Sequence, residues 1–524
     1  MLTSAEVSRG VLGKYIVDVD VTSFRNSAAI GRVDGGVTSS SPAEPKNNIR
    51  FLPSDTPIIE FDDLFLKVTS FGNYVTGVDT YYGSINGSEK DTFVLSVMDD
   101  RLYGYLHRGE LVLEVRFEES LSAHSLSILD LAKLPKDDDS LLIESSNGRG
   151  RKSIGGHKGR PTPIDPTISE NSIGGNGNIR VLVIYTEDVG NENNIYTLTA
   201  NIFAEMDASL DQSDVDPDVV VYSAGLVEEE ENFDGLCKDE IWQLAKDRDD
   251  PFDTLDSRLA SNDADVALII VTEESNGCSA PYKRIGGIAG AIFDSDQPFA
   301  ITMDTYALGD RTAAHELGHV FGGHHEVEYL DDCLNYHSMS YCYPEGEGTE
   351  SYAMGYVSSS EEWQTIMGGY YACDFVALPG TPDCVRVNKW SNPAIYYMGE
   401  ATGVTNESDM QSALEAQATT VAAWDTYPSA APSSAPTLTV VPGLCFGANT
   451  LSWTSVSGAD HYQVFQSASS GFSGSSRISV QTTRTLIVDI DYMDTQYFRV
   501  RACNGSGCGS YSSIKSASYY NGCI

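Results

Sequence analysis

The first 236 of the 524 residues contain no cysteine, and no pair of cysteines is spaced C-x-x-C anywhere in the chain. The missing pairs exclude a cysteine-based zinc site and a thioredoxin-type redox site. The ten cysteines fall in two even groups, six from Cys237 to Cys384 and four from Cys445 to Cys523. Even numbers predict disulfides, which form in oxidising compartments. We therefore expect a secreted, extracellular protein.

Long apolar runs are also missing. No stretch of about 18 apolar residues occurs, so the sequence predicts no membrane span. The N-terminal stretch MLTSAEVSRGVLGKYIVD lacks the apolar core of roughly 7–15 residues that a signal peptide needs. If the protein is secreted, we expect its leader to be missing from this sequence.

Basic residues are scarce: 33 lysines and arginines stand against 75 acidic residues, for a net charge of −42. This balance excludes nucleic acid as a partner, because a phosphate-binding surface requires a basic patch. Such acidity is typical of a well-solvated surface. Scattered carboxylates could also hold Ca²⁺, since hard cations take oxygen ligands, although no strict calcium-loop pattern is present.

The chain is too long for one domain, and its character changes along its length. Residues 1–134 are β-rich, and DTFVLSVMDDRLYGYLHRGELVLEVRF at 91–117 alternates apolar and polar residues around two turns. That alternation predicts a hairpin or meander. Residues 135–178 are rich in Gly, Pro, Ser and charge, which indicates a flexible linker. The one basic cluster of the chain lies there, at 149–160, so this linker is either a processing site or a plain solvated connection.

Residues 179–427 alternate between strand and helix patterns, which predicts an α/β domain. The expected strands are 179–186, 219–227 and 265–273, and the expected helices include 194–213 and 408–427. Residues 428–437, PSAAPSSAPT, form a Pro/Ser linker. Short alternating segments over 438–524 predict a C-terminal β-sandwich. The fold class is therefore multidomain, with β, α/β and β parts in that order.

The stretch RTAAHELGHVFGGHH at 311–325 contains four of the nine histidines. A helix over about 312–321 places His315 and His319 one turn apart on one face, which suits two ligands of a tetrahedral Zn²⁺. Glu316 is then placed to act on a water molecule as general base rather than to bind the metal.

The ends of this helix decide which histidine is the third ligand. Asp310 or Thr312 is expected to cap the start, and Gly322-Gly323 to end the helix with a sharp turn. The spacing H-E-x-x-H-x-x-G-x-x-H, counted from the first histidine of the motif, ends at His325. His324 occupies an unspecified position and is expected at the rim of the site.

With these residues the sequence resembles the metzincin metallopeptidases, which share the extended motif. The stretches IRVLVIYT, ADVALIIVTEESNGCSAP (264–281) and RVNKWSNPAIYYMGEATG (386–403) are similar to the bacterial, secreted, adamalysin/reprolysin-like branch. The resemblance covers 179–427 and implies a mixed twisted sheet, an active-site helix, and one catalytic zinc ion on His315, His319 and His325 with Glu316 as general base. Residues 1–134 resemble the propeptide that precedes such domains, and 438–524 resemble a fibronectin type III module.

Metzincins also carry a Met-turn, an apolar floor beneath the three histidines. The candidates are Met339 in HSMSY and Met367 in WQTIMGGYYAC. Bacterial relatives carry Thr-Ile-Met shortly before Ser-Asn-Pro, so the resemblance favours Met367 and leaves Met339 as the alternative. A Tyr two residues past the Met is absent, because Gly369 stands there. Tyr370, one residue later, is the remaining candidate for an oxyanion-stabilising tyrosine.

Some metzincins are kept inactive by a propeptide cysteine on zinc, a device that the cysteine-free N-terminal region excludes here. We expect the propeptide to block the cleft sterically, with a carboxylate or with His107, His124 or His157 near the metal. Taken singly, each of these histidines is more simply a surface or linker residue. Of two expected strands, 286–293 and 299–304, we favour the first as an edge strand that pairs with an extended substrate.

The sequence thus predicts a secreted, monomeric zinc endopeptidase, made as a zymogen and acting on protein or peptide substrates. One alternative is a secreted adhesion protein whose C-terminal sandwich is the working part. Another is a toxin-like protease of narrow specificity. Glu316 favours catalysis, because an inactive relative would be expected to lose that residue.

Overall fold

The computed structural model describes residues 11–17, 21, 48–49, 64–109, 111–119, 121–130, 177–192, 194–229, 238–272, 286–327, 350–360, 362–369, 384–425, 430–442, 449–473, 475–488, 490 and 494–518. The chain forms two compact units. The first comprises Met1–Asp130, Tyr196–Glu205 and Pro428–Ile524, and the second Leu131–Ile195 and Met206–Tyr427. No helix in the described ranges is long and apolar enough to span a membrane.

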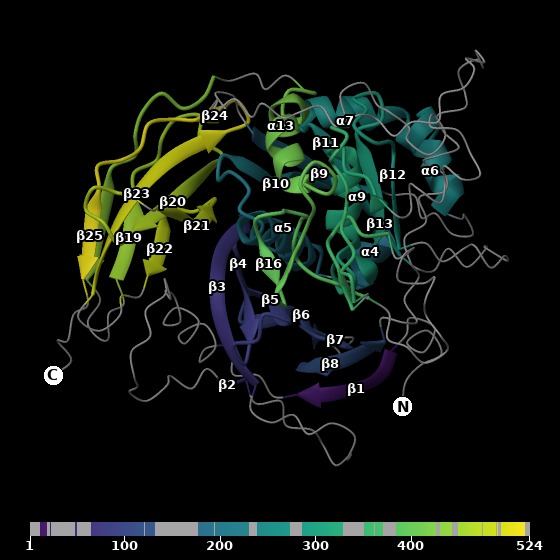
Figure 1. Cartoon of the computed structure of the whole chain (residues 1–524), viewed down its shortest axis with the longest axis horizontal. Coiled ribbons are helices and arrows are strands. Elements are labelled where there is room, and N and C mark those ends of the chain that lie inside the picture. Colours follow the sequence, from purple (N-terminus) through teal and green to yellow (C-terminus); the bar gives the residue numbers. More distant parts are fainter. Residues whose placement is uncertain are drawn as a thin grey trace. The chain divides into compact units, whose positions relative to one another are not determined.

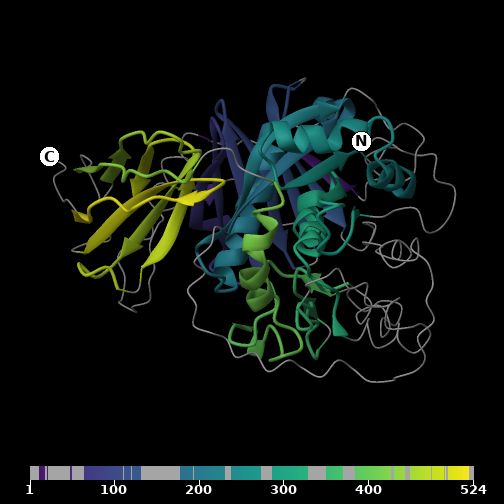
Figure 2. The same cartoon turned by 90° about the horizontal axis from the view of Figure 1, so that it is seen from above.

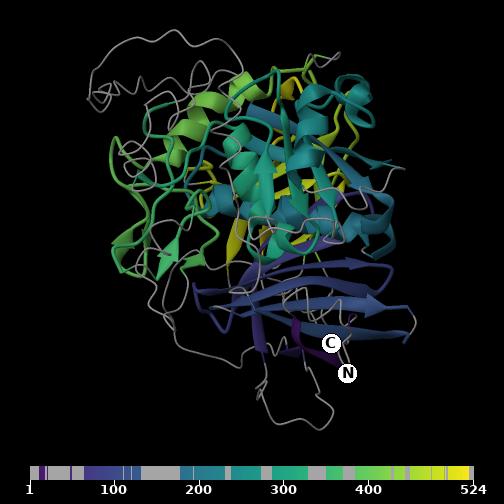
Figure 3. The ribbon, with the colours of Figure 1, turned by 90° about the vertical axis from the view of Figure 1, so that its right-hand side faces the viewer.

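The N-terminal part of the first unit is an antiparallel sheet in which consecutive strands are neighbours (Figure 3). Its strands are β1 (Val11–Val17), β2 (Asn48–Ile49), β3 (Leu64–Val75), β4 (Val78–Ile85), β5 (Asp91–Met98), β6 (Arg101–Arg108), β7 (Leu111–Glu118) and β8 (Ala123–Asp130). The meander expected over 91–117 is confirmed, since β5 pairs with β6 and β6 with β7. β1 is the exception to this order, because its partner is β8, the last strand of the series. Buried side chains such as Phe93, Leu95 and Leu106 form the core on one face.

The C-terminal part of the first unit consists of strands that share a second core (Figure 2). The strands are β18 (Leu438–Pro442), β19 (Asn449–Trp453), β20 (His461–Ser467), β21 (Ser476–Gln481), β22 (Thr485–Val488), β23 (Thr495–Asn504), β24 (Gly507–Cys508) and β25 (Lys515–Ser518). β18, β19 and β22 form one sheet, and β20 pairs with β21 and β23 in another. Trp453 and Tyr462 come from different sheets and both enter the core, as a sandwich requires.

The second unit is built on a five-stranded mixed sheet in the order β10-β9-β11-β13-β12 (Figure 1). Its strands are β9 (Gly177–Thr186), β10 (Val219–Glu229), β11 (Val266–Val271), β12 (Gly287–Ala289) and β13 (Phe299–Met303). All neighbouring pairs are parallel except β12–β13, which is antiparallel. β11 is buried along its whole length, as expected for a parallel strand covered on both faces.

Helices and short strands complete this unit. They are α4 (Glu187–Glu192), α6 (Lys238–Asp247), η3 (Phe252–Thr254), α7 (Leu255–Ser261), α8 (Tyr306–Gly309), α9 (Thr312–Val320), α13 (Met410–Val421), β14 (Trp363–Gln364), β15 (Val385–Arg386), β16 (Tyr396–Tyr397) and β17 (Glu400–Ala401), while α5 (Ile195–Gln212) contributes to both units. Trp242 of α6 and Phe252 pack with β9, β11 and β13 in one apolar core. This core holds the sheet against which α9 lies.

Candidate metal and catalytic site

Helix α9 carries the histidine motif, and all nine of its residues are buried. Gly322 follows the helix at φ +100°, the left-handed conformation that favours glycine. The amide of Gly322 donates to the His319 carbonyl (2.9 Å) and the amide of Gly323 to the Gly318 carbonyl (2.8 Å). These two bonds form a Schellman ending, which turns the chain sharply back so that His325 can approach the helix.

The start of α9 differs from the sequence expectation. The residue at the cap position is Arg311, at φ 57°, and no side chain caps the helix. The prediction that Asp310 or Thr312 caps it is therefore wrong. The reason is a competing partner, because the Asp310 carboxylate lies against the guanidinium of Arg386 instead.

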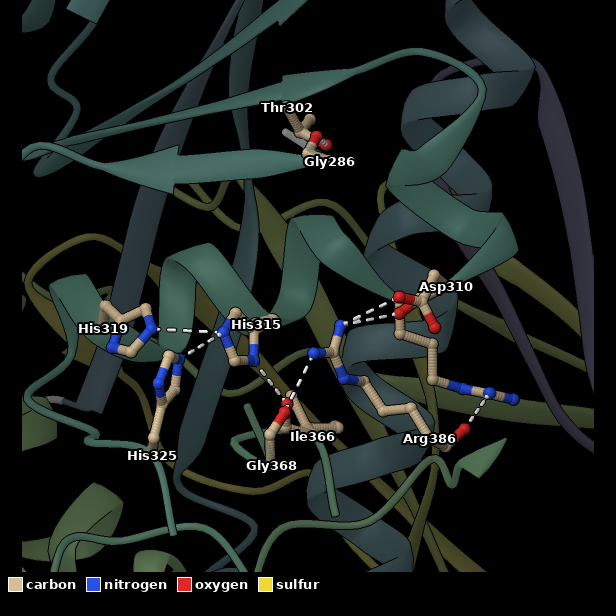
Figure 4. A network of polar contacts seen from close by, with 10 residues as sticks. Gly286, Thr302, Asp310, His315, His319, His325, Ile366, Gly368 and Arg386 are labelled. Atoms are coloured by element: carbon tan, nitrogen blue, oxygen red, sulfur yellow. Dashed lines mark hydrogen bonds and ion pairs between the residues drawn. The ribbon is translucent and has the colours of Figure 1, made fainter. Parts of the chain in front are cut away.

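Three histidine rings converge beside α9 (Figure 4). Nε2 of His315 lies 3.2 Å from Nε2 of His319 and 3.2 Å from Nε2 of His325. Nδ1 of His315 contacts the Ile366 carbonyl (2.6 Å), and Nδ1 of His319 the Gly323 carbonyl (2.8 Å). A carbonyl oxygen only accepts, so Nδ1 donates in both rings and each Nε2 keeps its lone pair.

This donor set fits a zinc ion. Two nitrogens bound to one tetrahedral Zn²⁺ lie about 3.3 Å apart, and the Nε2 atoms here lie at nearly that spacing. Imidazoles whose other nitrogen donates to a carbonyl are typical zinc ligands, because that bond fixes the tautomer and the ring orientation. By geometry, His315, His319 and His325 could therefore hold a metal ion together.

His324 lies next to the triad in sequence but does not join it. Its backbone amide donates to the Ala353 carbonyl (2.7 Å), and its carbonyl accepts from Gly355 (2.9 Å). The side chain is buried, so the expectation of a rim residue is wrong. Burial, together with the neighbouring imidazoles of His319 and His325, lowers the pKa of His324 to about 3. This ring therefore stays neutral at neutral pH.

Glu316 follows the first histidine and is fully buried. The edge strand β12 passes directly over it, and a Cβ placed on Gly287 would lie 2.5 Å from Glu316 Cγ and 2.6 Å from Oε1. Only a glycine leaves room for the carboxylate at this position. The prediction that 286–293 supplies an edge strand is confirmed, since β12 is the last strand of the sheet.

Met367 lies beneath α9 and is fully buried. A Cβ on Gly318, between the two helical histidines, would overlap Met367 Sδ and approach Trp390 to 2.9 Å. Gly369 packs on the third histidine, because its Cβ would lie 2.6 Å from His325 Nδ1. A tyrosine could not occupy that position in this arrangement. Met339 and Tyr370 lie outside the described residues.

Comparison with known proteins supports a metallopeptidase. Residues 238–326 match the family described as metallo-peptidase family M12B, reprolysin-like, and the match ends one residue past His325. Two proteins named peptidyl-Asp metalloendopeptidase, from Stenotrophomonas maltophilia strains R551-3 and K279a, are each 25% identical over 259 and 260 residues. Each alignment covers 49% of this chain, and the chain spans about half, 55%, of the length of these relatives.

Two solved structures match a short part of the chain. An Fn3-like protein from Clostridium thermocellum is 23% identical, with a TM-score of 0.16, and covers 17% of this chain and 92% of that one. The FN1–FN3 domains of chicken CNTN1 are 21% identical, with a TM-score of 0.16, and cover 17% of this chain and 32% of that one.

Two groups that help to hold the site together were not predicted from the sequence. Glu326, fully buried, accepts a bond from the amide of Gly369 (2.7 Å) through Oε2. Its only sequence signal is its place directly after His325. The second group is the pair of Asp310 and Arg386, separated by 76 residues. No local pattern predicts such a pair.

The N-terminal histidines considered as propeptide ligands are either buried within the first unit or outside the described ranges. His107 and His124 are buried, so neither is the surface residue expected; His124 Nε2 accepts from the amide of Leu102 (3.0 Å), and His107 lies 3.8 Å from Glu205. His157 and residues 131–176, which include most of the expected linker, are outside the described part. Within that part no further metal-ligating group of three side chains occurs, so the comparisons and the structure give Ca²⁺ no support.

Disulfides are present as the cysteine pattern predicts. Cys503 and Cys508 are bonded to each other, and Cys384 is also disulfide-bonded. The other seven cysteines lie outside the described residues, so their pairing stays a prediction.

Gly322→Ala is expected to destabilise the chain by more than the roughly 1–2 kcal/mol that a left-handed backbone costs a residue with a Cβ. The excess arises because the new Cβ would also overlap the amide of Gln417, a side chain that is itself buried and has little room to move. Gly399→Ala is the matched control, since Gly399 has φ +87° and nothing within 4 Å of its Cβ position. Urea unfolding of both variants measures the difference. Equal losses in the free energy of unfolding would show that the Gly322 turn tolerates a Cβ and does not fix the approach of His325.

Proposed function

We propose that this chain is a zinc-dependent endopeptidase of the metzincin type, similar to the adamalysin/reprolysin-like branch. The observation that carries the proposal is the convergence of three Nε2 atoms, from His315, His319 and His325, beside the buried carboxylate of Glu316. The three histidines would hold the ion. When bound, zinc supplies a Lewis acid that polarises the scissile carbonyl and lowers the pKa of water to about 7.

The protein's own groups carry the proton transfers. Glu316 would take a proton from the attacking water and return it to the leaving amine, as a general base and then a general acid. Nδ1–H of His315 and of His319 each donates to a backbone carbonyl oxygen, so both rings stay in one tautomer throughout. Met367 would form the apolar floor under the rings, and its burial against Gly318 favours it over Met339.

The substrate would lie along β12. An edge strand offers unpaired backbone groups to an extended peptide. Gly287 sits on β12 directly over Glu316, so a peptide paired with β12 passes close to the general base. The relatives are named peptidyl-Asp metalloendopeptidases. We therefore take peptide bonds beside aspartate as the substrate class to examine first.

The same proposal includes secretion and maturation. The disulfides of Cys384, Cys503 and Cys508 support an oxidising compartment. We propose that 1–134 is a propeptide, that cleavage occurs within 135–178 beside the basic cluster at 149–160, and that the mature enzyme is a monomer. N-terminal sequencing of active protein examines this step. Active protein that still starts at residue 1 would contradict it.

Digestion of a peptide library by the processed, zinc-loaded protein, with and without a chelator, tests the activity. We expect cleavage that the chelator abolishes and that added Zn²⁺ restores. We expect the cleaved bonds to be enriched in aspartate on one side. Cleavage without that enrichment would support the peptidase activity and contradict the proposed preference for aspartate. No cleavage by processed, zinc-loaded protein would instead favour the adhesion role of the C-terminal strands.

A further inference from the structure

Arg386 is a charged residue in the interior of the second unit, with 1% of its surface exposed. Its Nη1 donates to the backbone carbonyl of Asp310 (3.0 Å) and lies 3.5 Å from the Asp310 carboxylate. Its Nη2 donates to the carbonyl of Gly368 (2.9 Å). Figure 4 shows the guanidinium between these two residues. One side chain therefore joins the start of α9 to the turn that carries Met367.

That turn is the one that orients the first histidine. The amide of Gly368 donates to the Thr365 carbonyl (2.9 Å), which closes the turn around Ile366 and Met367. The Ile366 carbonyl accepts from Nδ1 of His315 (2.6 Å). A shift of Gly368 would therefore move the acceptor that fixes the His315 ring.

The connection closes into a ring of contacts. From Arg386 it runs through Gly368 and Ile366 to His315, then back along α9 to Asp310 and Arg386. A second contact reinforces it, because Nη1 of Arg311 donates to the Arg386 carbonyl. Arg386 thus contacts the start of α9 through both its side chain and its carbonyl, and it contacts the turn through its side chain.

We propose that Arg386 is a positioning residue for the metal site, which holds the Met367 turn so that the Ile366 carbonyl fixes the His315 ring. The inference rests on the proposed function, since it assumes that His315 binds zinc. A guanidinium suits the task because its planar fork reaches two acceptors at once, whereas a lysine ammonium acts as a single point charge. A buried ion pair often adds little net stability, because desolvation offsets the attraction, so the role of Arg386 is one of geometry.

Arg386→Lys in the full chain, with Arg180→Lys as matched control, tests this. Arg180 is also a buried arginine of the second unit, bonded to Asp265 (Nη2 to Oδ1, 2.6 Å) and to the Asp425 carbonyl (3.0 Å). The zinc dissociation constant and the rate of zinc release to a chromogenic chelator are measured well below the melting temperature of each variant. We expect both substitutions to lower the melting temperature. Only Arg386→Lys should weaken zinc binding, by about tenfold, near the low end of what loss of an outer-shell partner costs.

The outcomes separate positioning from plain stability. If Arg386→Lys releases zinc at the wild-type rate, or if Arg180→Lys weakens binding equally, the positioning role is overturned. Should Arg386→Lys fail to fold, the double variant Arg386→Met with Asp310→Asn carries the test, because it removes the Gly368 contact without leaving a buried carboxylate unpaired. Faster zinc release from the double variant then supports the proposal, and a wild-type rate overturns it. A wild-type chain that binds no zinc overturns the proposed function, and this inference with it.

Discussion

Glu316→Gln is expected to lower kcat/KM for peptide hydrolysis by about 10²–10⁴-fold while zinc stays bound. The amide matches the carboxylate in size, so it fits the space that Gly287 leaves above the helix. It cannot accept a proton from the attacking water, which is the one property that the substitution removes. The three histidines are untouched, so their donor set for zinc is unchanged. Activity against a cleavable peptide and zinc content of the same sample are the two measurements.

A surface variant provides the control. Glu362 is exposed and lies in the same unit, so Glu362→Gln removes one carboxylate of equal size without touching the site. We expect wild-type activity and zinc content from it. Full activity in Glu316→Gln would remove the general-base role. Loss of zinc together with activity would instead show that Glu316 helps to hold the metal, which the spacing of the motif does not predict.

The features that were predictable from sequence are those encoded over short distances. The pairing of β5, β6 and β7 follows from alternation and turns within one stretch of chain. The helix α9 and its ending follow from the local run Thr312–Val320 and the glycines after it. Two of the three histidines are one helical turn apart, and the third follows after a turn that glycine makes, so their convergence is also local.

What was not predictable depends on contacts between distant residues. Asp310 has the side chain of a helix cap, yet its carboxylate lies against Arg386, 76 residues away, and the cap position falls to Arg311. His324 has the sequence context of a surface residue, but its backbone pairs with Ala353 and Gly355 and its ring is buried. In both cases a long-range partner outcompetes the local preference, and a single sequence does not reveal that partner.

The order of the strands in the sheet was also not predictable from the sequence alone. The runs at 286–293 and 299–304 are both short and apolar, so periodicity alone does not tell an edge strand from an internal one. β13 turns out to be internal because it pairs with β11 as well as with β12. β12 is left at the edge, where its glycine meets Glu316. The strand order therefore places β12 on one side of the candidate site, and the Met367 turn bounds the site on the other side.

His325→Ala is expected to abolish high-affinity zinc binding and peptide hydrolysis, whereas His324→Ala keeps both. Nε2 of His325 lies 3.2 Å from Nε2 of His315, so its loss removes one of three converging donors. Loss of a ligand itself should exceed the roughly 10- to 100-fold that an outer-shell partner costs. His324 is held by backbone bonds that alanine preserves.

Thermal unfolding distinguishes a lost ligand from a merely weakened fold. Removing the buried His324 ring leaves a cavity, so His324→Ala is expected to melt below wild type both in chelator and in zinc. A ligand that binds only the folded state raises stability by RT ln(1 + [L]/Kd), so saturating zinc should raise the melting temperature of wild type and of His324→Ala by similar amounts. His325→Ala should gain almost nothing from zinc. The reverse pattern, with the zinc-dependent gain lost in His324→Ala and kept in His325→Ala, would assign the third ligand to His324, and the eleven-residue spacing would then have been counted to the wrong ring.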